Sequence, residues 1–289
     1  MCFDCDEFNE SKRDFLKGAA TAIVGAALKT QTFGQQTAPK ALDNPNVVHQ
    51  PVTFKNGADT IKGYLARPKK EGRFRAVLIS HGNPGISEDI RNTAAQMAEL
   101  DYVGLAIDWN SRETGDSSRL EKPLEFYITD AFNKQNMRDT QAGIDYLKTQ
   151  SFVIPKKAGI VGFCGGGYLA LRLAGISKDI KAVVAFYAPP VNDALRTSAT
   201  DPRPNLIAFA DKIKVPIQCH FGTQDRVIPF ADVTKFEQAL RAQKAKAEVY
   251  TYEGAGHAFY DYTRPHLHNP AAAKLAYERM KAFLKKQLG

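Results

Sequence analysis

The stretch at residues 158–168, Ala-Gly-Ile-Val-Gly-Phe-Cys-Gly-Gly-Gly-Tyr, constrains the possible folds more than any other part of the sequence. An apolar run stops at Gly162 and restarts as a predicted helix after Gly167, with Cys164 at the corner between them. A nucleophile elbow needs small residues two positions before and two after the nucleophile, because strand and helix pass closely there. Gly162 and Gly166 meet that demand, although a glycine-rich turn with an inert buried cysteine explains these residues equally well.

Strand and helix patterns alternate on both sides of this elbow. Buried strands are predicted at residues 76–80 and 102–107, and further strands at 182–186, 215–221 and 247–252. Helices are predicted at 88–100, 230–243 and 271–288, and one or two helices at 124–149. A hairpin is predicted at residues 52–65 around Asn56-Gly57. Residues 188–205 have little periodicity, which indicates a long surface loop. Strands that alternate with helices predict an α/β fold with a mostly parallel sheet covered on both faces.

Composition and charge exclude several classes of protein. The 44% hydrophobic and 24% charged residues are typical of a globular chain with a substantial core. The net charge of +8 is spread along the chain, and neither a basic stripe nor a known nucleic-acid module is found, so nucleic acid is not an expected partner. Of the four cysteines, Cys2 and Cys5 lie in the extreme N-terminus, and the spacing of the set does not predict a disulfide framework.

Residues 1–40 resemble an export leader and are not expected to be part of the fold, which leaves residues 41–289 as one domain. Residues 11–17 are similar to a twin-arginine motif, with Lys12 in place of the first arginine. The apolar run at 18–28 has the length of a signal region and is too short to span a bilayer. These features predict export by the twin-arginine machinery, to the periplasm; the alternative is a disordered tail on a cytoplasmic protein.

Two further strand ends carry side chains that can act together with Cys164. The strand at 215–221 leads into Asp225, and the strand at 247–252 leads into His257 within a glycine loop. Functional side chains of a parallel sheet gather at the carboxyl ends of its strands. The chain order of nucleophile, acid and histidine is that of the α/β-hydrolase triad, so we expect an α/β-hydrolase fold.

The residue types suit acyl transfer. A cysteine attacks as a thiolate, an adjacent imidazole takes its proton, and a carboxylate on the far ring nitrogen holds the tautomer. Separately, Asp225 also fits a turn-forming residue and His257 a surface-loop histidine. Cys219 and His220 lie inside a predicted strand and are expected to be core residues without partners for a metal. Neither a metal nor a cofactor is predicted.

Three segments resemble the signatures of the dienelactone hydrolase family, also called carboxymethylenebutenolidases. They are residues 162–167, 221–225 and 256–259, and the resemblance covers about residues 50–288. It implies a single-domain hydrolase that opens a small ester, lactone or enol-lactone through a thioester. In that scheme Cys164 is the nucleophile, His257 the base and Asp225 the orienting acid.

The fold also predicts an oxyanion hole and a substrate contact. Its donors are the N–H after the nucleophile, here Gly165, and an N–H of the loop opened by His81, here Asn83. Arg112 looks similar to an arginine that holds the substrate carboxylate in dienelactone-specific enzymes. A solvated loop arginine is the other interpretation of Arg112.

Two positions depart from the family pattern. Gly82 stands where a glutamate commonly takes part in handling the cysteine proton, so the family's activation scheme does not carry over whole. Asp261 stands where a second carboxylate-binding arginine is expected, which argues against strict dienelactone specificity. Two other functions fit the residues: a non-hydrolytic thiol protein that uses Cys164 for redox chemistry or sensing, and a binding module on a degenerate hydrolase scaffold.

Overall fold

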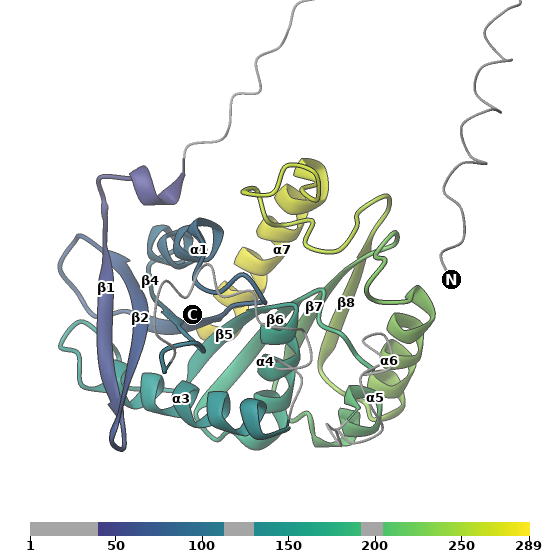
Figure 1. The fold of residues 1–289 in the computed structure, drawn as a ribbon, viewed down its shortest axis with the longest axis horizontal. Coiled ribbons are helices and arrows are strands. Elements are labelled where there is room, and N and C mark those ends of the chain that lie inside the picture. The colour runs from purple at the N-terminus through teal and green to yellow at the C-terminus, as the bar shows by residue number, and fades with distance from the viewer. Residues whose placement is uncertain (1–39, 113–129, 192–204) are drawn as a thin grey trace, which may run out of the picture. The chain divides into compact units, whose positions relative to one another are not determined.

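The structure is a computed structural model that describes residues 40–112, 130–191 and 205–289. The strands are β1 (Val47–Asn56), β2 (Asp59–Pro68), β3 (Arg75–Ser80), β4 (Tyr102–Ile107), β5 (Ala158–Phe163), β6 (Ile180–Phe186), β7 (Ile217–Gly222) and β8 (Ala247–Tyr252). Within the described chain they form one sheet in the order β1-β2-β4-β3-β5-β6-β7-β8 (Figure 1). The pairs β1–β2 and β2–β4 are antiparallel. The other six strands run parallel to one another, in the order β4, β3, β5, β6, β7 and β8.

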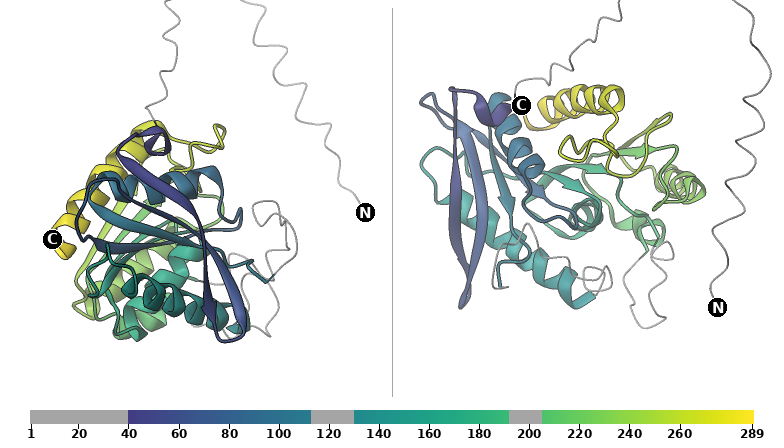
Figure 2. Two further views of the ribbon diagram at one scale, coloured as in Figure 1. Left: turned by 90° about the vertical axis from the view of Figure 1, so that its left-hand side faces the viewer. Right: turned by 45° about the horizontal axis from the view of Figure 1, so that its top comes forward.

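Helices cover both faces of this sheet. They are α1 (Glu88–Glu99), α3 (Asp130–Lys148), α4 (Gly165–Ile176), the short α5 (Leu206–Phe209), α6 (Phe230–Ala242) and α7 (Pro270–Leu288). Figures 1 and 2 show α1 and α7 on one face and α3, α4 and α6 on the other. The predicted α/β-hydrolase fold, with a mostly parallel sheet between two helical layers, is confirmed.

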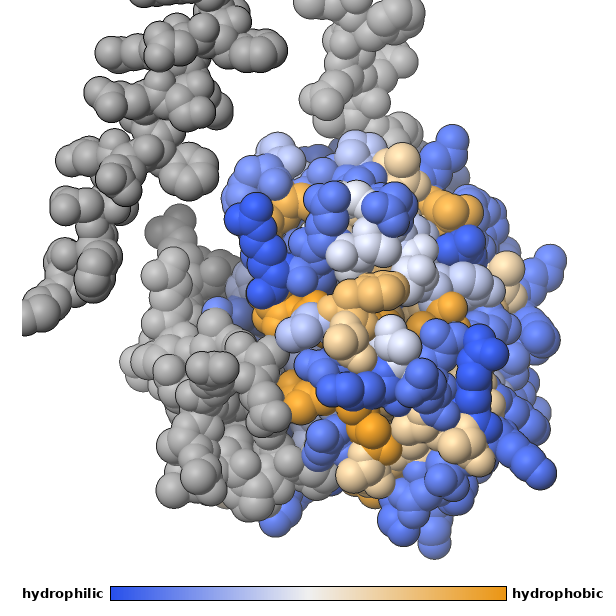
Figure 3. Space-filling model, turned by 90° about the vertical axis from the view of Figure 1, so that its right-hand side faces the viewer, coloured by the Kyte–Doolittle hydropathy of each residue, from blue (hydrophilic) through white to orange (hydrophobic). Residues whose placement is uncertain are grey.

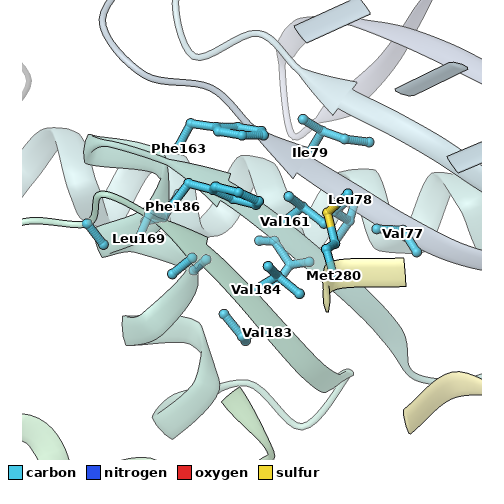
Figure 4. Packing of buried hydrophobic residues seen from close by; sticks show 14 of the residues in the cluster. Val77, Leu78, Ile79, Val161, Phe163, Leu169, Val183, Val184, Phe186 and Met280 are labelled. Carbon is cyan, nitrogen blue, oxygen red and sulfur yellow. The ribbon is translucent and has the colours of Figure 1, made fainter. Parts of the chain in front are cut away.

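The core follows from the apolar runs of the central strands. Every residue of β4, β5 and β7 is buried, as expected for parallel strands that have helices on both sides. Figure 4 shows Val161 of β5 and Val184 of β6 close to Met280 of α7, while Leu169 enters from α4. On the face of Figure 3, hydrophobic residues lie in separate patches among hydrophilic ones, which is ordinary for a protein surface.

Most of the predicted elements are present at nearly the predicted positions. The hairpin turns at Gly57, whose φ of +59° suits glycine. The helix after the elbow begins at Gly165, earlier than predicted, because Cys164 already ends the strand geometry and serves as the N-cap. The leader at 1–40 lies outside the described residues except for Lys40, as do residues 124–129 of the predicted helix and 192–204 of the predicted loop.

No helix of the described residues is both long and apolar enough to cross a membrane.

Candidate active site

Cys164 stands at a strained corner between β5 and α4. Its backbone has φ +53° and ψ −121°, a conformation that a residue with a Cβ adopts only when the surroundings impose it. The surroundings do so by hydrogen bonds on both sides: Cys164 N–H donates to the Phe186 carbonyl at 3.0 Å, and Tyr168 N–H donates to the Cys164 carbonyl at 3.0 Å. This geometry raises the thiol above the carboxyl end of the sheet, as the sequence pattern predicts.

The glycines around the corner are required by close packing. A Cβ on Gly162 would lie 2.3 Å from the Gly166 carbonyl oxygen, so the strand and the helix would collide. A Cβ on Gly166 would lie 2.1 Å from the Ser80 carbonyl oxygen, at the end of β3. Gly162 and Gly166 thus allow the start of α4 to pack closely against the ends of β5 and β3. This close packing is what the sequence pattern predicts.

Replacing Gly166 by alanine is expected to destabilise the fold by about 3–5 kcal/mol or to prevent folding, because the methyl group would meet immovable backbone atoms. Gly165→Ala is the matched control: the nearest atom to its Cβ is Trp109 Cζ3 at 3.8 Å, so its stability should change by less than about 1 kcal/mol. Urea unfolding of both variants measures the difference. Equal stability of the two variants would contradict the packing argument.

His257 and Asp225 complete a chain of contacts that begins at Cys164. His257 follows β8 and Asp225 follows β7, and the His257 Nδ1 atom lies 2.8 Å from Asp225 Oδ2. The other oxygen of Asp225 accepts from the backbone N–H groups of Val227 and Ile228, at 2.8 and 2.9 Å, which fixes the carboxylate. His257 and Cys164 are close enough that each shifts the pKa of the other. The structure therefore brings together the three residues singled out in the sequence.

The electrostatics favour a thiolate beside an imidazolium. Burial raises the pKa of the Cys164 thiol, but the His257 charge, the His257 hydrogen bond and the Gly165 N–H together outweigh it and lower that pKa overall. Burial of the His257 ring opposes protonation, but the Cys164 thiolate and the Asp225 hydrogen bond raise the pKa of His257 to about 10. At a pH between the pKa of Cys164 and that of His257, the thiol is negatively charged and the imidazole is positively charged.

The loop after β3 passes directly beside the thiol. A Cβ on Gly82 would lie 3.1 Å from the Cys164 Cβ, so a side chain at position 82 would point at the nucleophile. Asn83 follows immediately, and its N–H has no acceptor among the residues that the structure describes. The Gly165 N–H faces the Cys164 sulfur. The two predicted oxyanion donors thus come from the start of α4 and from the loop after β3.

His81 has a structural position in this loop. Its side chain is fully buried, and its Nδ1 lies 2.6 Å from the Gly82 carbonyl oxygen. Its Nε2 accepts from the Trp109 N–H at 3.1 Å, so the ring is a neutral tautomer with both nitrogens bonded. Burial lowers the pKa of His81, which keeps the ring neutral. His81 thereby ties the loop after β3 to the end of β4.

Arg112, predicted as a substrate-binding side chain, is engaged by two carboxylates. Its Nη1 and Nη2 donate to Asp139 at 2.7 and 2.9 Å, and its Nε donates to Asp59 at 2.7 Å. Asp59 begins β2, which is three strand positions from β5, or about 14 Å across a sheet. These ion pairs hold the Arg112 side chain between the start of β2 and α3. A substrate carboxylate at Cys164 would have to compete with them for the guanidinium.

Asp261, the other departure from the family pattern, is also paired within the protein. It accepts from the Arg264 Nε at 2.6 Å and from the Thr263 N–H at 2.9 Å. Glu88, at the start of α1, binds Lys40 at 2.5 Å and the Tyr262 hydroxyl at 3.1 Å. Glu88 and Asp261 therefore hold the loop that follows His257 in place.

Cys219 and His220 of β7 are core residues, as predicted. Cys219 is fully buried, and burial raises the pKa of its thiol to about 12. His220 lies between the Tyr252 hydroxyl at 2.7 Å and the Gln218 Oε1 at 3.0 Å. No group of three or more metal-ligating side chains is found in the described part of the chain.

Two aromatic residues next to Cys164 were not identified from the sequence. Tyr187 directly follows β6 and its ring centroid lies 5.0 Å from that of His257. Trp109 follows β4, its ring is tilted against that of His81 with the centroids 4.7 Å apart, and it borders Gly165. Both residues lie just past the carboxyl end of a strand, and this position was the available signal in the sequence. Aromatic residues at such positions can also be part of the hydrophobic core, so position alone did not single them out.

A family model described as "Dienelactone hydrolase family" matches residues 61–288. A protein of Methylorubrum extorquens named as a candidate carboxymethylenebutenolidase is 30% identical over 86% of this chain and 84% of its own length. A protein of Bradyrhizobium sp. named as a candidate 2-oxo-3-(5-oxofuran-2-ylidene)propanoate lactonase is 31% identical over 77% of this chain and 88% of its own.

Solved structures share the fold. A candidate dienelactone hydrolase from Klebsiella pneumoniae superposes with a TM-score of 0.73, at 24% identity, over 82% of this chain and 97% of the other. An esterase from Pyrococcus furiosus superposes with a TM-score of 0.62, at 20% identity, over 84% and 93% of the two chains. At 24% and 20% sequence identity, these superpositions show that the folds are similar.

Proposed function

We propose that this chain, which belongs to the dienelactone hydrolase family, hydrolyses small esters, lactones or enol-lactones through a thioester on Cys164. The protein is a hydrolase that acts on carboxylic ester bonds, as the family implies. The observation that carries the finer proposal is the line from Asp225, which hydrogen bonds with His257, to Cys164 at the elbow, whose pKa the His257 charge lowers. That line contains a nucleophile, a base and an orienting acid in the order that acyl transfer requires.

The proposed reaction has two halves. The Cys164 thiolate attacks the substrate carbonyl, and the negative oxygen that forms accepts hydrogen bonds from the Gly165 and Asn83 N–H groups. The carbon–oxygen bond to the leaving group then breaks, and the His257 imidazolium gives its proton to the departing alkoxide. In the second half, His257 takes a proton from water, the hydroxide attacks the thioester, and the acid is released as the thiolate reforms.

A panel of esters and lactones, with mass spectrometry of the protein as the readout, tests this function. Rapid quenching with p-nitrophenyl acetate is expected to trap an acetyl adduct, and peptide mapping is expected to place it on Cys164. Turnover without an adduct on Cys164, or an adduct on another residue, would contradict the proposed thioester. Absence of turnover across the panel would contradict the substrate class.

Alkylation of Cys164 should depend less steeply on pH than alkylation of a free thiol. Because the pKa of Cys164 is lowered from its usual value of 9.0, a larger fraction of the thiol is thiolate at pH 7. A free thiol reacts with iodoacetamide about 30-fold more slowly at pH 7 than at pH 9, and the decrease for Cys164 should be smaller. His257→Ala should restore the steep profile, because burial alone raises the pKa of the thiol. Peptide mapping separates Cys164 from the other cysteines.

The redox or sensing alternative gains no support from the described residues. A resolving thiol would have to reach Cys164, and Cys219 is fully buried with a pKa raised to about 12. Cys164 and Cys219 are both free thiols in the described chain. We therefore propose the hydrolytic function alone.

Export of the protein stays a proposal based on residues 1–40. The motif with Lys12 and the apolar run at 18–28 support a leader of the twin-arginine type. Cell fractionation with an antibody against the folded domain is expected to find a shortened protein in the periplasm. Full-length protein confined to the cytoplasm would contradict this localisation.

A further inference from the structure

Several polar atoms beside the active site are buried without a partner. The Trp109 Nε1 atom and both amide atoms of Asn110 and of Asn136 have no hydrogen-bond partner among the described residues. Their residues are only 4%, 1% and 1% exposed. Leaving a donor or acceptor buried and unpaired is unfavourable, so native proteins rarely keep several in one place without a ligand or a bound water.

Two contacts join the loop after β4 to α3. The Trp109 ring lies 6.0 Å from the Phe132 ring, and Arg112 binds Asp139. In the sequence, Asn110 lies between the two loop residues, and Asn136 lies between the two helix residues. Phe132 and Asn136 are also one helical turn apart and so lie on the same side of α3. The unpaired amides are thus carried by two segments that pack together, and the space between these segments is where the amides can meet.

This space adjoins the nucleophile. Trp109 Cζ3 is the nearest atom to a Cβ placed on Gly165, at 3.8 Å, and Gly165 directly follows Cys164. His81, whose ring centroid lies 4.7 Å from that of Trp109, begins the loop that carries Asn83. The indole thus lies beside both segments that supply the proposed oxyanion donors.

The strand order places this space on the side of Cys164 away from His257. Cys164 ends β5, whereas Trp109 and Asn110 follow β4 on one side and His257 follows β8 on the other. A leaving group must reach the proton of His257, so the acyl part of a substrate bound to Cys164 extends in the opposite direction, towards β4.

We propose that Trp109, Asn110 and Asn136 form a neutral hydrogen-bonding subsite for an uncharged polar group, an ether, carbonyl or hydroxyl oxygen, in the acyl part of the substrate. The indole N–H and the two amides supply donors and acceptors without a charge. Arg112, which lies in the same loop, is bound by Asp139 and Asp59. Its guanidinium is therefore not free to bind a substrate carboxylate in this subsite. This inference rests on the proposed hydrolytic function.

Two esters of nearly equal shape test the subsite. p-Nitrophenyl methoxyacetate has an ether oxygen where p-nitrophenyl butyrate has a methylene group, and the leaving group is the same. Each kcat/KM is divided by the rate constant for hydroxide hydrolysis of that ester, which removes the difference in intrinsic reactivity. The wild-type protein is expected to prefer the methoxyacetate, and Asn136→Leu and Trp109→Phe are each expected to lower this preference about tenfold.

Thermal melting separates a binding role from a structural role. Leucine has nearly the shape of asparagine, so Asn136→Leu removes an unpaired buried amide and should melt no lower than the wild type. Gln141→Leu on the same helix is the control, because Gln141 bonds to Asp179 at 2.9 Å, and it should keep the wild-type preference.

Other results would overturn the subsite. Equal preferences in the wild type, Asn136→Leu and Trp109→Phe would show that no polar group is recognised there. Melting of Asn136→Leu several degrees lower, with an unchanged preference, would show that the amide is structural. Failure of the proposed function would appear separately, as turnover that persists in Cys164→Ala, and the subsite would then fall with it.

Discussion

Replacing Cys164 by alanine is expected to lower kcat for p-nitrophenyl acetate by at least about 10⁴-fold, because the variant lacks the proposed nucleophile. The variant should fold, since alanine at φ +53° has nearly the same backbone strain as cysteine. Initial rates and thermal melting of the same preparation measure both effects. Background hydrolysis is subtracted, because the oxyanion donors that stay in place can retain a small part of the catalysis.

Two other variants serve as controls for this result. Cys219→Ala removes a buried thiol of β7 and should keep its activity while losing about 1 kcal/mol of stability through the small cavity. Cys164→Gly should be as inactive as the alanine variant but about 1 kcal/mol more stable, because glycine relieves the positive φ. Activity of Cys164→Ala above about one hundredth of the wild-type rate would refute the nucleophile.

His257→Ala is expected to lower kcat by about 10³- to 10⁴-fold, which is the second-largest effect. The variant loses the group that accepts the thiol proton and later protonates the leaving alkoxide. It also loses the charge that lowers the pKa of Cys164, so the little activity that remains should rise with pH. A pH–rate profile at saturating substrate, compared with that of the wild type, measures both consequences.

Asp225→Asn provides a graded comparison with His257→Ala. The asparagine oxygen can keep the bonds from the Val227 and Ile228 N–H groups, so the turn should survive. Its NH2 group would then face the His257 Nδ1, which favours the tautomer with the proton on Nε2 and leaves no base for the thiol. We expect a loss of about 10²- to 10⁴-fold. Wild-type rates in either variant would show that the contacts do not serve catalysis.

The two departures from the family pattern bear on the range of substrates. Gly82 places no side chain against the thiol, so among the described residues the thiolate has His257 as its charged partner. Arg112 and Asp261 are both held in ion pairs within the protein. The unpaired polar atoms of Trp109, Asn110 and Asn136 are neutral, which is consistent with the proposed preference for uncharged acyl groups.

Part of the site could be predicted because it depends on short stretches of chain. The elbow requires small residues at Gly162 and Gly166, and the clashes that a Cβ would cause there explain the requirement. Asp225 and His257 each follow a strand, and parallel strands end at the same edge of a sheet, so their approach to Cys164 follows from strand order.

Other parts could not be predicted because they depend on which segments pack together. The sequence indicates that Arg112 lies near the carboxyl end of a strand, but only the fold places Asp139 of α3 and Asp59 of β2 around its guanidinium. Trp109, Asn110 and Asn136 carry no motif, and their unpaired polar atoms become apparent only once the loop after β4 is packed against α3.

The class of fold, the glycine corner and the chain order of Cys164, Asp225 and His257 could be read from the sequence, because periodicity, glycine spacing and strand ends are local properties. The electrostatic coupling of Cys164 with His257, the ion pairs of Arg112 and the unpaired amides of Asn110 and Asn136 required the tertiary structure. Burial and the pairing of charges decide these features, and both depend on residues far apart in the chain.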